Sequence, residues 1–286
     1  MKCEKQQVVK IILAIVLLVG LVACAGQSTK PSAKTEAELR AAPGALLIMV
    51  EREAGSESFT SRLFVNEGYL RMSDARSPMD FILFNRKDKI IYNVSQDDKT
   101  IMVIRNKAVE IDPPISLDYQ EESQLSSAIP RIDGQQATHY RFTANGKHCY
   151  DSVVMPEGFM PDVLAALREF RMVLAGEHAT TLDRTPKDLL DACDLSLNIF
   201  HATQHMDHGL PIREWDRKGY QRFMKDYRMG MMASEDLFDL PKDFKRYSVG
   251  DVLLQTPGKG VPMPDVNSSD DNNKGVQVGS DSQEGS

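Results

Sequence analysis

The sequence lacks the features that identify several common classes of protein. It contains no nucleophile elbow, no phosphate-binding loop and no metalloprotease helix motif, so we expect it not to be an enzyme and nothing in it indicates a cofactor. It has no excess of positive charge, because 34 Lys and Arg face 41 Asp and Glu for a formal net charge of −7. An acidic chain of this kind is a poor partner for nucleic acid. Its apolar run at residues 11–23 is shorter than the roughly twenty residues that a transmembrane helix needs.

The amino terminus has the order of a secretory signal peptide. Lys2, Lys5 and Lys10 precede the apolar run at residues 11–23, as a charged region precedes an apolar region in exported proteins. We therefore predict that residues 1–23 are a signal peptide. Its removal would make the remaining chain more acidic, since it carries more basic than acidic residues.

The end of this run resembles the bacterial lipobox. The residues Leu21-Val22-Ala23-Cys24 place small side chains before a cysteine, and the resemblance implies cleavage before Cys24 and acylation of its thiol. Several acyl chains on one cysteine give stable membrane anchoring. In Gram-negative sorting, Ala25 in place of Asp favours the outer membrane. The resemblance thus implies a lipoprotein anchored in the cell outer membrane and facing the periplasm, with the membrane as its first partner.

Cysteine usage is consistent with that compartment. Of four cysteines, Cys3 lies in the predicted signal peptide and Cys24 is the predicted lipidation site, which leaves Cys149 and Cys193 as candidates for a disulfide. A redox-active pair is the alternative, although the sequence has no C-x-x-C spacing.

Composition divides the rest of the chain. Residues 24–44 are small and polar, as expected of a flexible tether, and residues 257–286 are rich in Gly, Ser, Asn and Asp, as expected of a disordered acidic tail. Between them, residues 45–256 are long enough for one domain with a substantial core.

The first part of this domain has the pattern of strands joined by tight turns. Short segments rich in β-branched and aromatic residues predict strands at 45–53, 58–65, 69–73, 80–85, 89–94, 100–105, 138–143 and 148–154. The breaks between them are a few residues long, and Asn145-Gly146 is a typical hairpin turn, so neighbouring strands should be antiparallel. Residues around Pro113, Pro114 and Pro130 are expected to be irregular.

The periodicity then changes. Apolar residues at helical spacing follow Pro161 and stop at Gly176, which predicts an amphipathic helix with Val163, Leu167, Phe170 and Leu174 on its buried face. A second short helix is expected at residues 185–193, and strands are expected from Leu195 onward and at 220–232. The sequence therefore predicts an α+β fold, a curved antiparallel sheet (incomplete barrel) wrapped on one or two helices.

Several predicted strands are apolar on both faces. One face can pack on the helix, so the other needs a second cover, a ligand or a partner. The candidates for lining a ligand cavity are Phe81, Leu83, Tyr92, Ile101, Val103, Phe223, Tyr227, Met229 and Met231. The thioethers of Met224, Met229, Met231 and Met232 could likewise line a cavity for flexible acyl chains, although such residues are more often ordinary sheet core. Trp215 is expected to be a packing anchor.

The order of these parts resembles a known group. A lipobox, a tether, a strand meander that includes MDFILFNRKDKIIYNVSQDDKTIMVI, a helical excursion and the segment GLPIREWDRKGYQRFMKDYRM are similar to the uncharacterised periplasmic lipoproteins built on the half-barrel of the carrier LolA and the receptor LolB. The resemblance covers residues 45–250 and implies an apolar concave face that holds acyl chains. The helical excursion with Cys149 and Cys193 departs from the carrier pattern.

Three functions remain open at this point. The first is a lipoprotein that binds an apolar or lipid ligand, or lipoprotein-like cargo, in the concave face of the half-barrel. The second is a structural or assembly subunit of a cell-envelope complex, with an envelope protein as partner. The third is a metal-binding or hydrolytic protein centred on His201, His205 and His208, which would share one face of a helix.

Overall fold

The computed structural model describes residues 34–127 and 129–251. The predicted signal peptide, the lipidation site at Cys24 and the predicted tail at 257–286 lie outside the described residues. The chain divides into two units, residues 1–38 and 39–286, and every strand belongs to the second unit.

A short helix, α2 (Glu36–Ala41), lies within the segment predicted to be a flexible tether, so that prediction is wrong for its last residues. A capping box explains the helix start: the Thr35 hydroxyl accepts a hydrogen bond from the Glu38 amide at 3.3 Å, and the Glu38 carboxylate accepts one from the Thr35 amide at 2.7 Å.

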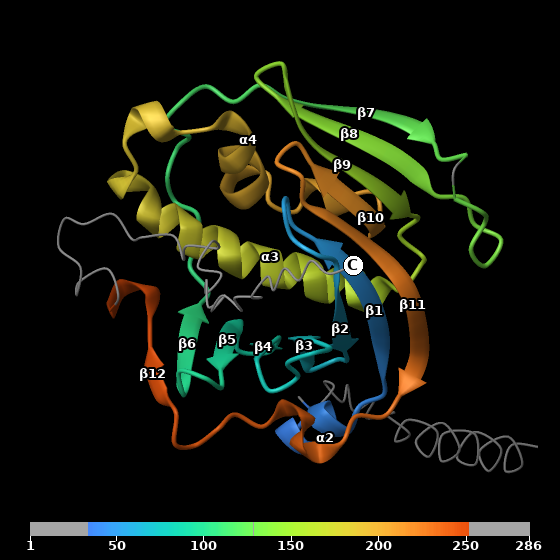
Figure 1. The fold of residues 1–286 in the computed structure, drawn as a ribbon, viewed down its shortest axis with the longest axis vertical. Coiled ribbons are helices and arrows are strands. Elements are labelled where there is room, and N and C mark those ends of the chain that lie inside the picture. Colours follow the sequence, from blue (N-terminus) through green and yellow to red (C-terminus); the bar gives the residue numbers. More distant parts are fainter. Residues whose placement is uncertain (1–33, 128, 252–286) are drawn as a thin grey trace, which may run out of the picture. The chain divides into compact units, whose positions relative to one another are not determined.

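The second unit is built on a twelve-stranded, mostly antiparallel sheet in the order β12-β6-β5-β4-β3-β2-β1-β11-β10-β9-β8-β7. The strands are β1 (Gly44–Arg52), β2 (Phe59–Val65), β3 (Tyr69–Asp74), β4 (Phe81–Asn85), β5 (Ile90–Ser95), β6 (Thr100–Arg105), β7 (Tyr119–Leu125), β8 (Thr138–Ala144), β9 (Lys147–Met155), β10 (Leu210–Asp216), β11 (Gln221–Met231) and β12 (Lys245–Tyr247). The sheet is open and curves around one long helix, α3 (Pro161–Thr181) (Figure 1). The prediction of a curved antiparallel sheet combined with helices is confirmed.

The helix packs its apolar face on the sheet, as predicted. Val163, Leu164, Leu167, Phe170 and Val173 join β-strand side chains in the largest hydrophobic cluster. Burial of a large apolar side chain stabilises the fold by about 2 kcal/mol, so this face anchors the helix. Figure 1 shows α3 lying across the molecule between β7–β10 and β2–β6.

The helix extends beyond Gly176, where the sequence predicted its end. Gly176 lies within the last turns of α3. A Cβ at this position would collide with the backbone carbonyl of Lys107, in the segment that follows β6, so only glycine fits here. The glycine therefore permits close packing of the helix on a neighbouring backbone and does not end the helix.

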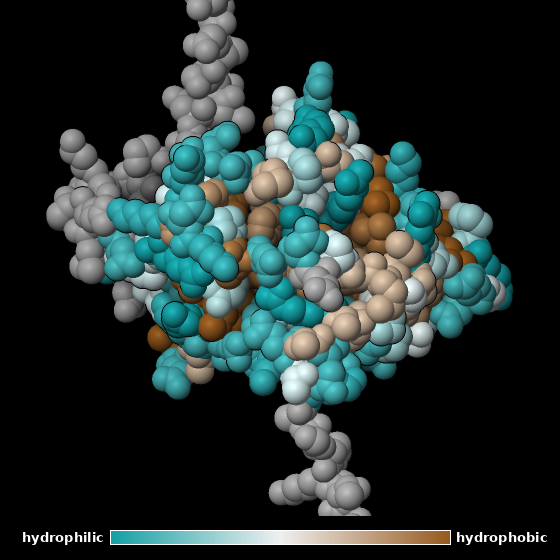
Figure 2. Space-filling model, turned by 90° about the horizontal axis from the view of Figure 1, so that it is seen from below, coloured by the Kyte–Doolittle hydropathy of each residue, from teal (hydrophilic) through white to brown (hydrophobic). Residues whose placement is uncertain are grey.

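The opposite face of β2–β6 is covered by the chain itself. The C-terminal segment, residues 233–247, carries Phe238 and Phe244 into a second hydrophobic cluster, and β12 pairs in parallel with β6. Phe238 is 1% exposed, and its ring stacks on that of Tyr69 with 4.6 Å between centroids. This segment runs along the lower side of the molecule in Figure 1, and the view from below shows mostly hydrophilic residues with smaller hydrophobic areas between them (Figure 2).

The segment between α3 and β10 differs from its prediction. The expected second helix at 185–193 is a 3-10 turn (Lys187–Leu189) followed by α4 (Ala192–Leu195). The expected strand from Leu195 is wrong, because Ser196–Phe200 forms a π-helical turn. Leu195 and Ile199 are both buried, and their spacing of four residues fits a helical turn packed near α3 better than a strand.

Three strands, β7, β10 and β12, were not predicted from the sequence. β7 lies in the stretch expected to be irregular, and all its residues except Tyr119 are exposed because it is the terminal strand of the sheet. β10 begins directly after the turn at Gly209. The strand predicted at 220–232 is confirmed as β11.

Candidate functional site

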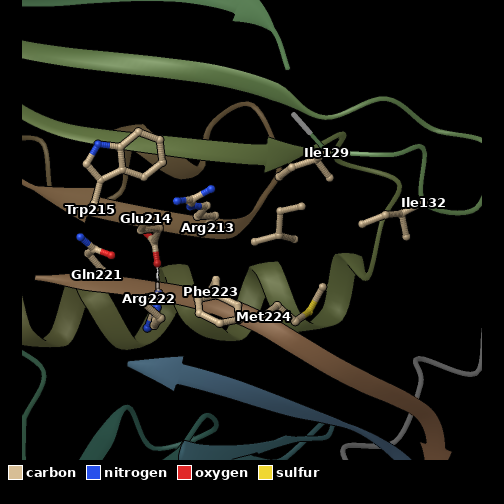
Figure 3. Close-up of a pocket in the computed structure, with 10 residues that line it drawn as sticks. Ile129, Ile132, Arg213, Glu214, Trp215, Gln221, Arg222, Phe223 and Met224 are labelled. Atoms are coloured by element: carbon tan, nitrogen blue, oxygen red, sulfur yellow. Dashed lines mark hydrogen bonds and ion pairs between the residues drawn. The ribbon is translucent and has the colours of Figure 1, made fainter. Parts of the chain in front are cut away.

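A pocket of about 570 Å³ lies where β10 and β11 separate. The two strands pair only at Arg213–Phe223, Glu214–Arg222 and Trp215–Gln221. Beyond these pairs, β11 continues along β1 and β10 continues along β9. Figure 3 shows the side chains of both strands around the resulting space. Volumes of about 300 to 1,000 Å³ are typical of small-ligand pockets, so the space is large enough for a ligand.

The lining is mainly apolar and comes from three parts of the chain. The apolar residues are Ile129 and Ile132 from the β7–β8 connection, Ile212 and Trp215 from β10, and Phe223 and Met224 from β11. A tight turn fixes the connection, because Ile132 and Gln135 exchange backbone hydrogen bonds of 3.0 and 2.9 Å. Gln136 also donates its side-chain amide to the carbonyls of Ser126 and Ile129, at 2.6 and 3.3 Å.

One side of the pocket is formed by a buried ion pair. Arg222 donates its Nε to the Glu214 carboxylate at 2.7 Å, and its Nη2 contacts the same oxygen. The Tyr150 hydroxyl donates to the other oxygen of Glu214. Glu214 is 1% exposed, so these contacts replace its lost hydration.

Glu214, Arg222 and Tyr150 determine one another's ionisation states. Burial alone would raise the pKa of the Glu214 carboxyl, but the Arg222 guanidinium outweighs it and lowers that pKa to about 2. Burial and the charge of Glu214 raise the pKa of the Tyr150 hydroxyl well above its usual value. At neutral pH the cluster therefore holds one carboxylate, one guanidinium and a neutral tyrosine.

His205 lies beside this cluster. Its Nε2 is 3.8 Å from the Glu214 carboxylate, and neither ring nitrogen has a hydrogen-bond partner in the described part of the chain. Burial, with the nearby charge of Arg171, lowers the pKa of the His205 imidazole to about 3. The residue is therefore neutral at physiological pH.

The rim of the pocket carries an aromatic and cationic stack. The Arg213 guanidinium carbon lies 5.3 Å from the centre of the Trp215 ring, and the His139 ring stacks on Trp215 with 5.3 Å between centroids. His139 is held in turn by Asp151 at 2.8 Å. Trp215 is thus a packed residue, as expected, and it also forms a wall of the pocket.

The predicted cavity residues are dispersed. Phe81, Leu83 and Ile101 are buried under the C-terminal segment, with Tyr92, Val103 and Met231 at the edge of the same cluster. Tyr227 contacts Phe159 edge-on and donates its hydroxyl to Asp133, while Met229 is 57% exposed. Of the nine candidates, Phe223 is the one that lines the pocket. Six of the others belong to the cluster under the C-terminal segment, which covers the second face of the sheet.

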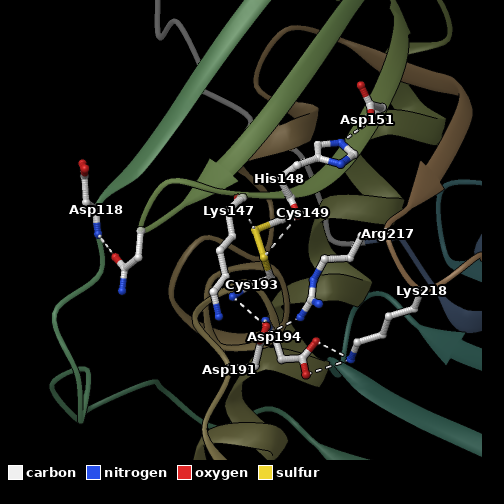
Figure 4. The surroundings of a disulfide bond; sticks show 11 residues. Asp118, Lys147, His148, Cys149, Asp151, Asp191, Cys193, Asp194, Arg217 and Lys218 are labelled. Atoms are coloured by element: carbon white, nitrogen blue, oxygen red, sulfur yellow. Dashed lines mark hydrogen bonds and ion pairs between the residues drawn. A yellow bond between two sulfur atoms is a disulfide. The ribbon is translucent and has the colours of Figure 1, made fainter.

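The two remaining cysteines form a disulfide, as predicted. Cys149 on β9 is joined to Cys193 on α4, with 5.2 Å between their Cα atoms (Figure 4). The Asp191 side chain caps α4 by accepting from the Cys193 and Asp194 amides at 3.0 and 3.2 Å. The bridge therefore attaches the helical excursion to the sheet.

The three histidines proposed as metal ligands point to different neighbours. His201 stacks on Tyr119, His205 lies beside Glu214, and His208 stacks on Tyr140 and contacts Glu121 at 2.9 Å. Within residues 34–127 and 129–251, no group of three His, Cys, Asp or Glu side chains is arranged to hold a metal ion. The shared helical face expected for these histidines is absent because the segment forms short separate turns.

Sequence reasoning missed most of the pocket. Ile212, Glu214 and Arg222 alternate with outward residues on β10 and β11, and that alternation was a usable signal for β10. Ile129 and Ile132 had no such signal, because they lie in an irregular connection and reach the pocket through tertiary folding.

None of the helices in the described part of the chain combines the length and hydropathy needed to span a lipid bilayer.

Comparisons with known proteins give remote structural likenesses. No family model and no curated protein matches the chain. An uncharacterized conserved protein from Thermus thermophilus has a TM-score of 0.38 at 11% identity, covering 74% of this chain and 93% of its own. PNGF-II has a TM-score of 0.37 at 8% identity, and MucB has 0.33 at 13%. Each of these two similarities covers 73% of this chain. The matched part is 32% of the length of PNGF-II and 61% of the length of MucB. These values are too low to indicate a shared function.

Proposed function

We propose that this protein binds a ligand with an apolar chain in the pocket between β10 and β11. The observation that carries the proposal is the pocket itself, about 570 Å³ with six apolar side chains around it. Binding pockets are typically mostly apolar with a few polar groups that orient the ligand. The pocket has this composition, since Arg213, Gln221 and the Glu214–Arg222 pair are its polar members.

The site differs from the one expected from the half-barrel resemblance. There the acyl chain would occupy the concave face, but α3 packs against that face here. We therefore propose the same class of ligand, one with an apolar chain, at a different site, the pocket between β10 and β11. The half-barrel interpretation of the open, curved sheet is part of this proposal.

The proposed location is the periplasmic side of the outer membrane, with Cys24 acylated. The Cys149–Cys193 disulfide supports export, because structural disulfides persist in oxidising compartments. Metabolic labelling with palmitate tests the anchor: label in the natural chain and none in Cys24→Ser is expected, and equal labelling of both would contradict it.

Native mass spectrometry with decanoate tests the proposed binding. The natural chain is expected to retain one decanoate, and Ile132→Trp is expected to lose it because the larger side chain fills the pocket. Ile132 is partly buried in a connection, so the fold should tolerate the change. Ile111→Trp is the matched control, since Ile111 is 38% exposed and lies outside the pocket. Equal retention by all three proteins would contradict the proposal.

A further inference from the structure

Arg213 stands where two pockets meet. The apolar pocket between β10 and β11 shares Ile129, Arg213 and Trp215 with a second pocket of about 200 Å³. The second pocket is more polar, because Gln124, Ser126, Ser127 and His139 also line it. A molecule placed across the junction would have its apolar part on one side of Arg213 and its polar part on the other.

The other charged groups named around this junction have hydrogen-bond or ion-pair partners. Glu214 is paired with Arg222, and Asp151 accepts from His139 and Arg141 at 2.8 and 3.2 Å and also contacts His148. The Asp133 carboxylate, next to Ile132 in the chain, accepts from Tyr227 at 3.0 Å and lines neither pocket.

Arg213 has no such partner. Within residues 34–127 and 129–251, its guanidinium forms no hydrogen bond or ion pair, and it packs against the face of Trp215 at 5.3 Å. The side chain is exposed. An uncompensated guanidinium held against an aromatic ring keeps its planar donors available to an anion.

We propose that the ligand is a single-chain amphiphile with an anionic headgroup. Its chain occupies the apolar pocket, and its carboxylate or phosphate meets Arg213 at the junction, where a guanidinium can donate two parallel hydrogen bonds. The Ser127 hydroxyl and the Gln124 amide line the polar side. Figure 3 shows Arg213 between Trp215 and Ile129, two residues that line both pockets. This inference rests on the proposed binding of an apolar chain and adds the charge of the ligand.

Isothermal titration calorimetry with four ligands that share one chain tests the inference. Decanoate, decyl phosphate, decanol and decyltrimethylammonium are titrated below their micelle concentrations. The two anions are expected to bind about tenfold more tightly than decanol, as charge-assisted hydrogen bonds imply, and the cation most weakly. The ratio between decyl phosphate and decanoate then shows which anion the site prefers.

The Arg213→Gln variant is expected to bind all four ligands with the affinity of decanol. Arg105→Gln is the matched control, because Arg105 is an exposed arginine on β6 outside both pockets, and it should keep the preference for anions. Equal binding of decanol and decanoate by the natural chain, unchanged in Arg213→Gln, would overturn the charge assignment and leave the apolar pocket standing. Failure of all four ligands to bind would overturn the proposed function and this inference together.

Discussion

Glu214 on β10 and Arg222 on β11 face each other as the central pair of a three-residue contact between the two strands, with 2.7 Å between Nε and the carboxylate. The pair lies at the point where the strands separate and the pocket opens. It therefore stabilises the short contact between β10 and β11, whose backbones diverge beyond these three pairs.

Replacing Glu214 by Gln is expected to lower the free energy of unfolding by about 3 kcal/mol, because it leaves the largely buried Arg222 guanidinium without its counter-charge. Chemical denaturation measures the change. Glu110→Gln, at an exposed position, should alter stability by less than about 0.5 kcal/mol. A loss in Glu214→Gln no larger than in the control would show that the pair is dispensable.

His205 predicts an acid-sensitive component of stability. Its folded pKa of about 3 lies below the ordinary 6.5, so the unfolded chain binds the proton more readily and stability falls as the pH decreases from 6.5 toward 3. Between pH 7 and pH 5 this residue alone should lower the free energy of unfolding by about 2 kcal/mol. The Glu214 carboxylate acts in the opposite direction on the His205 pKa, but less strongly than burial does.

Denaturation curves at pH 7 and pH 5 measure that component. His205→Leu should remove most of the difference between the two pH values. His178→Leu, at an exposed position on α3, should leave the difference unchanged. The same pH dependence in His205→Leu and the natural chain would contradict the assignment.

The disulfide is expected to contribute about 4 kcal/mol to stability, given the 44 residues that separate its cysteines. The double variant Cys149→Ser, Cys193→Ser should unfold at a lower denaturant concentration, with a free energy of unfolding that is lower by about 4 kcal/mol. Dithiothreitol should destabilise the natural chain and leave the double variant unaffected. If dithiothreitol destabilised both proteins equally, its effect would not be due to reduction of the Cys149–Cys193 disulfide.

The C-terminal segment is expected to be an integral part of the fold. Phe238→Ala should cost about 3 kcal/mol, because the ring fills a buried site against Tyr69 and Phe64. It should also increase binding of a hydrophobic dye, since the outer face of β2–β6 becomes accessible. Leu189→Ala, at a side chain that is 69% exposed, is the control. A stable Phe238→Ala protein without dye binding would mean that the cover is not needed.

The apolar face of β2–β6 illustrates how far the sequence could be read. Strands such as β4 and β6 are apolar on both faces, which correctly predicted that a second layer covers them. Periodicity is a local property, however, and could not show that residues 233–247 form this layer. Gly176 illustrates the same limit, because a helix-ending glycine and a glycine packed on Lys107 have the same local sequence. The regular strands were predictable because alternation follows from burial of one face.

The pocket was harder to predict than the strands. Of its members, only Phe223 and Met224 were proposed to line a ligand cavity, because the pocket arises where strand pairing ends and not from a hydrophobic pattern. The disulfide was predictable by elimination, since the other two cysteines have other predicted fates.

An apolar chain in the space between β10 and β11 would lie against Trp215, so the emission of this residue reports on binding directly. It is the one tryptophan in the chain, and it forms a wall of the pocket. Titration with decanoate should give a saturable change in tryptophan emission that fits one site per chain. This change should be absent in Ile132→Trp. Ile111→Trp, which also carries a second tryptophan, is the control for the emission of the added indole. An emission spectrum that stays constant up to the micelle concentration would contradict the account.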